Sequence, residues 1–185
     1  MKRIFAAIKI DAEGKLTEIY KGLKTKLIHE KINWMELQNL HTTLKFFGET
    51  PEDKIDDICA MLSKCAQAHQ SFELLLQNTG IFGSSYQPRV IWFGMQNTLP
   101  LEMLAKDVLQ GAETLGWERD RQNFRPHLTV ARIKFLNDKR YFQQVIDSYK
   151  NVSLQKIAVS SFALIESRLR PQGPEYQVLE RFDLG

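Results

Sequence analysis

His41-Thr42-Thr43-Leu44 in the first half of the chain and His127-Leu128-Thr129-Val130 in the second half are two copies of one pattern, His-x-Thr-x. Both copies lie in runs of apolar and β-branched residues, which are typical of strands. On a strand, residues i and i+2 point to the same face, so each copy presents an imidazole beside a hydroxyl. The repeat therefore indicates two similar halves that each contribute one such strand.

Strand and helix patterns alternate on both sides of each copy. Strands are expected at 2–10, 72–77, 89–95, 154–165 and 176–184, and helices at 16–27, 101–115 and 141–149. Thr50-Pro51-Glu52-Asp53 predicts the start of a further helix, because a capping hydroxyl precedes a proline and acidic residues. Turns are expected at 80–85 and at Pro171-Gln172-Gly173-Pro174. No Gly/Ser linker divides the chain, so we expect a single domain over residues 1–185 whose halves share a cleft.

The composition excludes several classes of protein. The chain has 185 residues, of which 43% are hydrophobic and 25% charged, so it can bury a real core and is not a disordered chain. No apolar run approaches a membrane span, and the first residues do not form a signal peptide, so we expect a cytoplasmic protein. Cys59 and Cys65 lie six positions apart in an expected helix, too far for a local disulfide, and should be reduced thiols on its apolar stripe.

Positive charge is concentrated in one part of the chain. The net charge is only +3. Residues 119–140, however, carry seven basic side chains against Asp120 and Asp138: Arg119, Arg121, Arg125, Arg132, Lys134, Lys139 and Arg140. This basic window is compatible with an anionic partner and also with an ordinary solvated surface.

Two histidines paired with two threonines suit the cleavage of a phosphodiester. Without a metal, that reaction needs a base for water, an acid for the leaving oxygen and donors for the oxygens that gain charge. With an ordinary pKa of about 6.5, one imidazole can be neutral while the other is cationic. A single His-x-Thr is explained equally well by strand propensity and a buried hydrogen bond. The duplication favours the acid-base site, since the other two of the four histidines, His29 and His69, have no such context and are assigned to helix faces or ends.

Other catalytic chemistries find less support in the sequence. A zinc site is not expected, because neither a helical histidine pair nor a cluster with a third ligand is present. A serine nucleophile lacks the Gly-x-Ser-x-Gly turn, and both cysteines belong to an apolar helical stripe. We therefore expect no metal and no cofactor.

Five stretches of the chain together resemble one family. They are 39–49 (NLHTTLKFFGE), 88–92 (PRVIW), 124–132 (FRPHLTVAR), Glu166-Ser167 and 173–176 (GPEY). In this combination the chain resembles the two-histidine phosphoesterases, specifically the LigT-like RNA 2′,3′-cyclic phosphodiesterases, over nearly its whole length. One departure is Thr42, where the family usually has an aliphatic residue; we expect it to affect packing only.

The resemblance implies a fold, a reaction and a set of site residues. The fold would be bilobal α+β, with two pseudo-symmetric lobes, each an antiparallel sheet flanked by helices, and an active-site groove between them. The reaction would be hydrolysis of an RNA 2′,3′-cyclic phosphate terminus to a 2′-phosphomonoester. His41 would be the general acid and His127 the general base, although the sequence alone does not assign these roles. Thr43, Thr129 and Arg132 would bind the phosphate.

Some candidates are weaker. Arg132 lies five residues after His127, so on a regular strand it would face away from it and needs a bend to reach the phosphate. Arg125 and Arg89 are candidates for contacts with the RNA backbone. Aromatic side chains near the motifs are candidates for stacking on a terminal base, although core packing explains them equally: Trp34, Phe46, Phe47, Phe82 and Tyr86.

Several functions remain open at this stage. Besides hydrolysis, reverse 2′-5′ RNA ligation can use the same acid-base groups. Related enzymes act on 2′-5′ oligoadenylates or small cyclic nucleotides, and a non-catalytic RNA-binding module would also suit the basic window. The expected partners are RNA 3′ ends or nucleotides with a cyclic phosphate. We expect a monomer with no obligate protein partner and no membrane.

Overall fold

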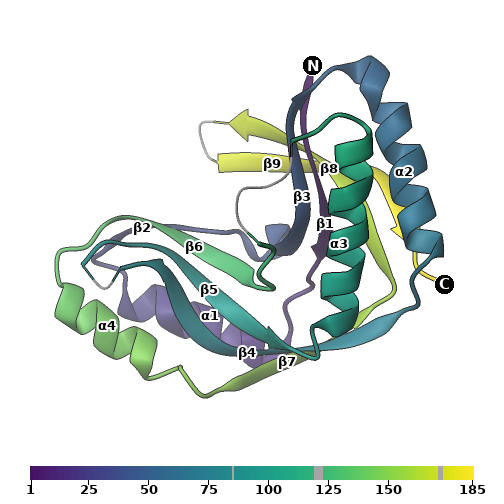
Figure 1. Ribbon diagram of the computed structural model, residues 1–185. Helices are drawn as coiled ribbons and strands as arrows, with labels where there is room; N and C mark the ends of the chain where they lie inside the picture. Colours follow the sequence, from purple (N-terminus) through teal and green to yellow (C-terminus); the bar gives the residue numbers. More distant parts are fainter. Residues whose placement is uncertain (85, 119–122, 171–172) are drawn as a thin grey trace.

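The computed structural model describes residues 1–84, 86–118, 123–170 and 173–185 as two antiparallel sheets with helices packed against them (Figure 1). The first sheet has the strand order β3 (His41–Thr50), β1 (Lys2–Lys9), β8 (Ser161–Arg170) and β9 (Gly173–Asp183). Helices α2 (Ile55–Gln67) and α3 (Leu99–Thr114) pack on one face of it. On β1 that face is formed by buried Ile4, Ala6 and Ile8, which alternate along the strand.

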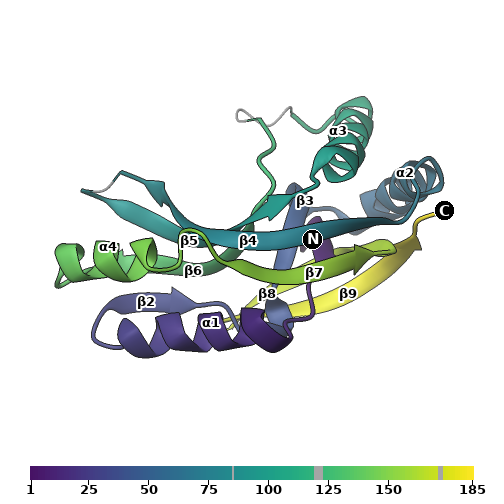
Figure 2. The same cartoon turned by 90° about the horizontal axis from the view of Figure 1, so that it is seen from below.

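The second sheet has the order β2 (Lys31–Trp34), β6 (Leu128–Phe135), β5 (Pro88–Gln96), β4 (Phe72–Gly83) and β7 (Ser153–Val159). Helices α1 (Gly14–Lys26) and α4 (Lys139–Asp147) pack on this sheet. Figure 2 shows α1 on the opposite side of the molecule from α2 and α3. Short 3-10 helices precede β3 and α2: η1 (Leu37–Asn39) and η2 (Glu52–Lys54).

The two sheets correspond strand by strand from the His-x-Thr strands outward. The order β3-β1-β8-β9 in the first sheet matches β6-β5-β4-β7 in the second, and β2 is an addition outside β6. The expected α+β fold of two similar antiparallel lobes is therefore confirmed. One apolar cluster includes side chains from both sheets, for example Leu44 of β3 and Phe93 of β5, so the halves share a core.

Several expected boundaries were wrong. Thr50 does not cap a helix: it is the last residue of β3, where it pairs with Lys2, and its hydroxyl donates to the carbonyl of Gly48 at 3.2 Å. Helix α2 begins only at Ile55, after η2. The expected single strand at 154–165 is two strands, β7 and β8, separated at Ser160.

The turn expected at 80–85 is also wrong in its first part, because β4 continues to Gly83. The strand contains a bulge at Asn78, whose φ is 57°. Gly80 is needed inside the strand because the Trp92 ring on β5 occupies the space of a side chain: a Cβ at Gly80 would lie 2.3 Å from it. Ser85, and Pro171 and Gln172 of the second expected turn, lie outside the described residues.

Cys59 and Cys65 both lie on α2 as free thiols, as expected, and burial raises the pKa of each. Among the described residues, no helix is long and apolar enough to cross a membrane.

Candidate active site

The two His-x-Thr segments meet at the centre of the molecule. His41 is the first residue of β3, and His127 directly precedes β6. The hydroxyl of Thr42 donates a hydrogen bond of 3.3 Å to the backbone carbonyl of His127. Thr42 is 1% exposed, so this bond lies inside the protein. The expectation that Thr42 affects packing only is therefore wrong: its hydroxyl joins the two motifs.

Both imidazoles are held in the same way. Nδ1 of His41 lies 2.7 Å from the carbonyl oxygen of Asn39, and Nδ1 of His127 lies 2.6 Å from that of Arg125. A carbonyl can only accept, so each Nδ1 carries the proton that is donated. In each ring Nε2 is then the nitrogen left for chemistry: it accepts a proton when the ring is neutral and donates one when the ring is charged.

A β-bulge brings Arg132 to the face of the sheet that carries Thr129. On β6, Thr129 pairs with Trp92 and Ala131 with Ile91, so Val130 is an extra residue. Val130 and Ala131 both pack into the core, and the alternation shifts by one position. Arg132 therefore lies on the same face of the sheet as Thr129, although a regular strand would place them on opposite faces. We call this face, in both sheets, the groove face.

The same bulge occurs on β3. Thr43 pairs with Ala7 and Lys45 with Ala6, which leaves Leu44 as the extra residue. Phe46 then shares the groove face with Thr43 and occupies the place that Arg132 has in the other half. Phe46 is 45% exposed, and the guanidinium of Arg3 lies 4.9 Å from its ring centroid.

The charges at the site act on His41. Burial is the main reason that the pKa of His41 is lowered, and the positive charges of Arg132 and His127 lower it further. The bond to the carbonyl of Asn39 opposes this effect. Arg132 is thus close enough to His41 to affect its pKa electrostatically. It also lowers the pKa of Tyr176, which burial raises.

Aromatic rings surround the imidazole of His41. Its ring centroid lies 4.9 Å from that of Phe5 on β1 and 5.3 Å from that of Tyr176 on β9, with Tyr176 edge-on at 86°. Phe5 and Tyr176 also touch each other, at 5.2 Å. These rings exclude water from one side of His41, which accounts for its burial.

One aromatic ring supports His127. Phe82 on β4 lies edge-on at 4.8 Å between ring centroids, and Phe82 in turn contacts Trp92 at 5.4 Å. Trp92, whose ring lies against Gly80, thus also contacts the ring that lies beside His127.

The two weaker arginine candidates, Arg125 and Arg89, lie in different positions relative to the groove face. The backbone of Arg125 holds His127, while its side chain is exposed. Arg89 alternates with Val90 on β5 and so lies on the face opposite the groove, together with buried Ile91, which does not favour the expected RNA contact. Arg119 and Arg121 lie outside the described residues.

Among the aromatic candidates, Phe47 is 6% exposed and belongs to the core, and Trp34 is partly buried. Phe82 contacts His127, whereas Phe46 and Tyr86 are exposed. Phe46, Phe82 and Tyr86 therefore remain open to a ligand.

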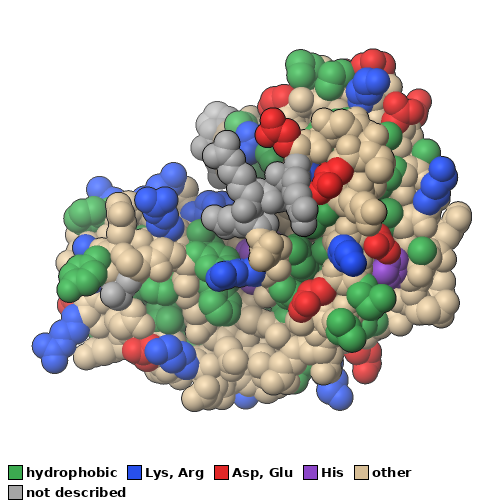
Figure 3. Space-filling model, in the orientation of Figure 1, with side chains coloured by type: hydrophobic (Ala, Val, Ile, Leu, Met, Phe, Trp, Pro, Cys, Tyr) green, Lys and Arg blue, Asp and Glu red, His purple; other side chains and the backbone are tan. Residues whose placement is uncertain are grey.

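The residues that orient the histidines were not expected from the sequence. Asn39 and Arg125 act through backbone carbonyls, which no side-chain pattern indicates, and Phe5 and Tyr176 approach His41 from other strands. Figure 3 shows a histidine in the hollow between the two halves, with Lys and Arg side chains beside it. In the described part of the chain, no group of three or more His, Cys, Asp or Glu is placed to hold a metal ion.

Comparison with known proteins assigns the fold to a family. Residues 24–170 match the model of the 2′-5′ RNA ligase superfamily. The chain is 32% identical over 182 residues to an RNA 2′,3′-cyclic phosphodiesterase of Methanocaldococcus jannaschii, covering 97% of this chain and 99% of that protein. It is 31% identical to one of Aquifex aeolicus, over 100% of both chains.

Solved structures show the same fold over nearly the whole chain. A protein of Thermus thermophilus superposes with a TM-score of 0.79 at 30% identity, covering 98% of this chain and 97% of that one. The fold is also that of E. coli LigT complexed with 3′-AMP, with a TM-score of 0.72 at 24% identity, covering 99% and 98% of the two chains. The resemblance found in the sequence is thereby confirmed.

Proposed function

The chain belongs to the 2′-5′ RNA ligase superfamily, and we propose that it hydrolyses RNA 2′,3′-cyclic phosphate termini to 2′-phosphomonoesters without a metal. Curated relatives at about 30% identity over nearly the full length carry the name RNA 2′,3′-cyclic phosphodiesterase. The observation that carries the proposal is the mirrored pair of imidazoles, each with Nδ1 bonded to a carbonyl two residues earlier and Nε2 left for chemistry.

In the proposed reaction, each imidazole moves one proton. Nε2 of neutral His127 takes a proton from water as the water oxygen forms a bond to phosphorus. The bond between phosphorus and the ribose 3′ oxygen breaks, and Nε2–H of cationic His41 protonates that oxygen. The product keeps its phosphate on the 2′ oxygen. Afterwards His127 carries a proton and His41 is neutral, so a proton exchange with water restores both.

The remaining site residues would bind the phosphate. Thr43 and Thr129 share the groove faces of their sheets with the histidines and would donate their hydroxyls to the non-bridging oxygens. Arg132, brought to the same face by the bulge at Val130, supplies a permanent positive charge for the negative charge that develops in the transition state. The lowered pKa of His41 makes it a stronger acid, and a bound anionic phosphate would favour its protonated form.

The proposal extends to the cell and to ligation. The same two imidazoles would catalyse 2′-5′ ligation when the 5′-hydroxyl of another RNA end replaces water: His127 takes its proton, the 5′ oxygen forms a bond to phosphorus, and His41 protonates the leaving 3′ oxygen. We also propose that the protein acts in the cytoplasm as a single-domain monomer on RNA ends, as expected from the sequence.

The test is hydrolysis of a short RNA with a 2′,3′-cyclic phosphate in excess EDTA. Wild type should be active and produce a 2′-phosphate, while His41→Ala and His127→Ala should each lose at least about 10²-fold in rate. The double variant should be little slower than either single variant, since both residues act in one step. Activity abolished by EDTA, or retained by either histidine variant, would show that the proposal is wrong. Salt-sensitive RNA binding without turnover would indicate a binding module instead.

A further inference from the structure

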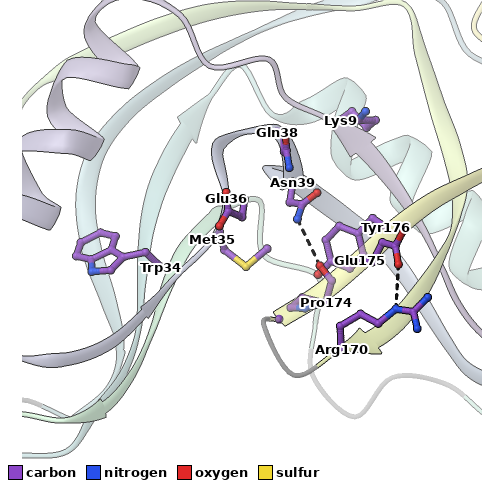
Figure 4. A pocket seen from close by; sticks show the side chains of 11 residues that line it. Lys9, Trp34, Met35, Glu36, Gln38, Asn39, Arg170, Pro174, Glu175 and Tyr176 are labelled. Atoms are coloured by element: carbon purple, nitrogen blue, oxygen red, sulfur yellow. Dashed lines mark hydrogen bonds and ion pairs between the residues drawn. The ribbon is translucent and has the colours of Figure 1, made fainter.

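A cavity adjoins the catalytic site on the His41 side. It has a volume of about 690 Å³ and lies between the Trp34–Asn39 segment and the start of β9 (Figure 4). Two of its walls belong to the site: Tyr176 touches the His41 ring, and the carbonyl of Asn39 holds Nδ1 of His41. The cavity therefore borders on the residues that hold His41. Its other lining residues include Lys9, Trp34, Met35 and Gln38.

Lys9 lies at the junction of this cavity with the groove face. It is the register partner of His41 in the β1–β3 pair, so its side chain stands beside His41 on the same face of the sheet. Lys9 also lines a second cavity of about 400 Å³ that continues over this face towards Val178 and Arg181. It is exposed, and no carboxylate is paired with it in the described parts of the chain.

The proposed mechanism decides on which side the RNA chain must lie. In an in-line displacement, the attacking water and the leaving 3′ oxygen are on opposite sides of phosphorus. The leaving oxygen belongs to the terminal ribose, and His41 protonates it. The terminal nucleoside therefore lies on the His41 side, which is also the side of Lys9 and the cavity.

We propose that the cavity beside His41 binds the nucleotide that precedes the terminal one, and that Lys9 binds the phosphodiester between these two nucleotides. This inference rests on the proposed function. An ammonium group suits a phosphate, the Tyr176 ring suits a base face, and the Gln38 amide suits a base edge. It follows that the enzyme prefers RNA oligomers to mononucleotides, and that 2′,3′-cyclic mononucleotides are poor substrates.

The test uses three substrates that add one part at a time. They are a nucleoside 2′,3′-cyclic phosphate, the same compound with a 5′-phosphate, and a dinucleotide with a 2′,3′-cyclic phosphate end. We expect wild-type kcat/KM to rise at each step. In Lys9→Gln the gain from the 5′-phosphate should be lost, about tenfold in kcat/KM, while the first substrate is unaffected. The slope of log kcat/KM against log salt for the dinucleotide should weaken by about 0.7.

A second variant tests the cavity itself. Gln38→Ala, on the exposed side of the cavity, should lower kcat/KM for the dinucleotide about threefold to tenfold and leave the two mononucleotides unchanged. Thermal unfolding is measured alongside. The matched control is Lys106→Gln, an exposed lysine on α3, which packs on the opposite face of the first sheet; it should change no substrate.

The outcomes separate the inference from the function. If Lys9→Gln lowers kcat/KM equally for all three substrates, or for none, the inference is wrong while the proposed function stands. The inference is also wrong if wild type does not distinguish the dinucleotide from the mononucleotides. If wild type hydrolyses no substrate of the series, the proposed function fails, and the inference fails with it.

Discussion

His41 and His127 occupy equivalent places in the two halves, and comparing them shows how a near-repeat produces two different groups. In each half, Nδ1 bonds to the carbonyl two residues earlier, and a bulge follows at the fourth position of the motif. The surroundings differ: aromatic rings bury His41 and lower its pKa. Five residues further on, the first half has Phe46 and the second has Arg132. Matching backbones hold the rings, and unlike neighbours give the two rings different surroundings.

The largest effect on this comparison should come from removing the charge of Arg132, whose place on the groove face is taken by Phe46 in the first half. Arg132→Gln should lower kcat/KM for a cyclic-phosphate RNA about 10- to 100-fold, because a charge-assisted bond to the phosphate is lost. Arg132→Lys should restore part of the activity, since it keeps the charge and loses the planar fork. Steady-state kinetics measures both.

The control for Arg132 is Arg140→Gln at the exposed start of α4, which should leave kcat/KM within about twofold of wild type. Equal losses in Arg132→Gln and Arg140→Gln would mean that the effect is general electrostatic attraction, and that the bulge has no special role.

An effect of intermediate size is expected on the pH dependence of the His41 ring and of kcat/KM. His41 has a lowered pKa, so NMR titration of its ring in the free protein should give a midpoint below the ordinary 6.5. The proposed reaction needs one protonated and one neutral imidazole, so kcat/KM should fall at both ends of the pH range, which gives a bell-shaped profile. In Arg132→Gln, the His41 midpoint should rise, since one of the charges that lower it is gone.

The lowered pKa of His41 should also make the stability of the protein depend on pH. The unfolded chain binds a proton at His41 more readily than the folded protein does, so the free energy of unfolding should decrease as pH falls below about 6.5. A midpoint for His41 at or above 6.5 would contradict the lowered pKa of that residue. A flat rate profile from pH 5 to 9 would contradict the proposed acid-base reaction.

The smallest effect should come from the bond that joins the halves. Thr42→Val loses the hydrogen bond to the His127 carbonyl and should destabilise the protein by about 1 kcal/mol. It should also lower kcat with little change in KM, because the backbone that carries His127 is less firmly placed. Thr42→Ser, which keeps the hydroxyl, should restore kcat.

Thr50→Val is the matched control for Thr42. Its hydroxyl is equally buried but bonds within its own strand, to Gly48. It should lose similar stability, measured by denaturant unfolding, and keep its kcat. If both variants lose the same fraction of kcat, Thr42 acts through stability alone.

Local patterns predicted most of the elements, because strand and helix periodicities depend on neighbouring residues. The failures occurred where a distant contact outweighs local preference. Thr50 has the character of a helix cap but pairs with β1, and Gly80 has the character of a turn but lies under Trp92. The bulges had a visible signal in retrospect: the adjacent apolar residues Val130 and Ala131 interrupt the alternation.

The sequence by itself determined which residues are the candidates for the chemistry and which family the chain belongs to, because a duplicated His-x-Thr and its flanking motifs are properties of the chain alone. Only the tertiary structure decided how those residues differ. The burial of His41, the register that puts Lys9 beside it, and the bond from Thr42 to His127 all join segments far apart in the sequence. The pKa of a side chain and its contacts depend on what surrounds it in space, and no local pattern encodes those surroundings.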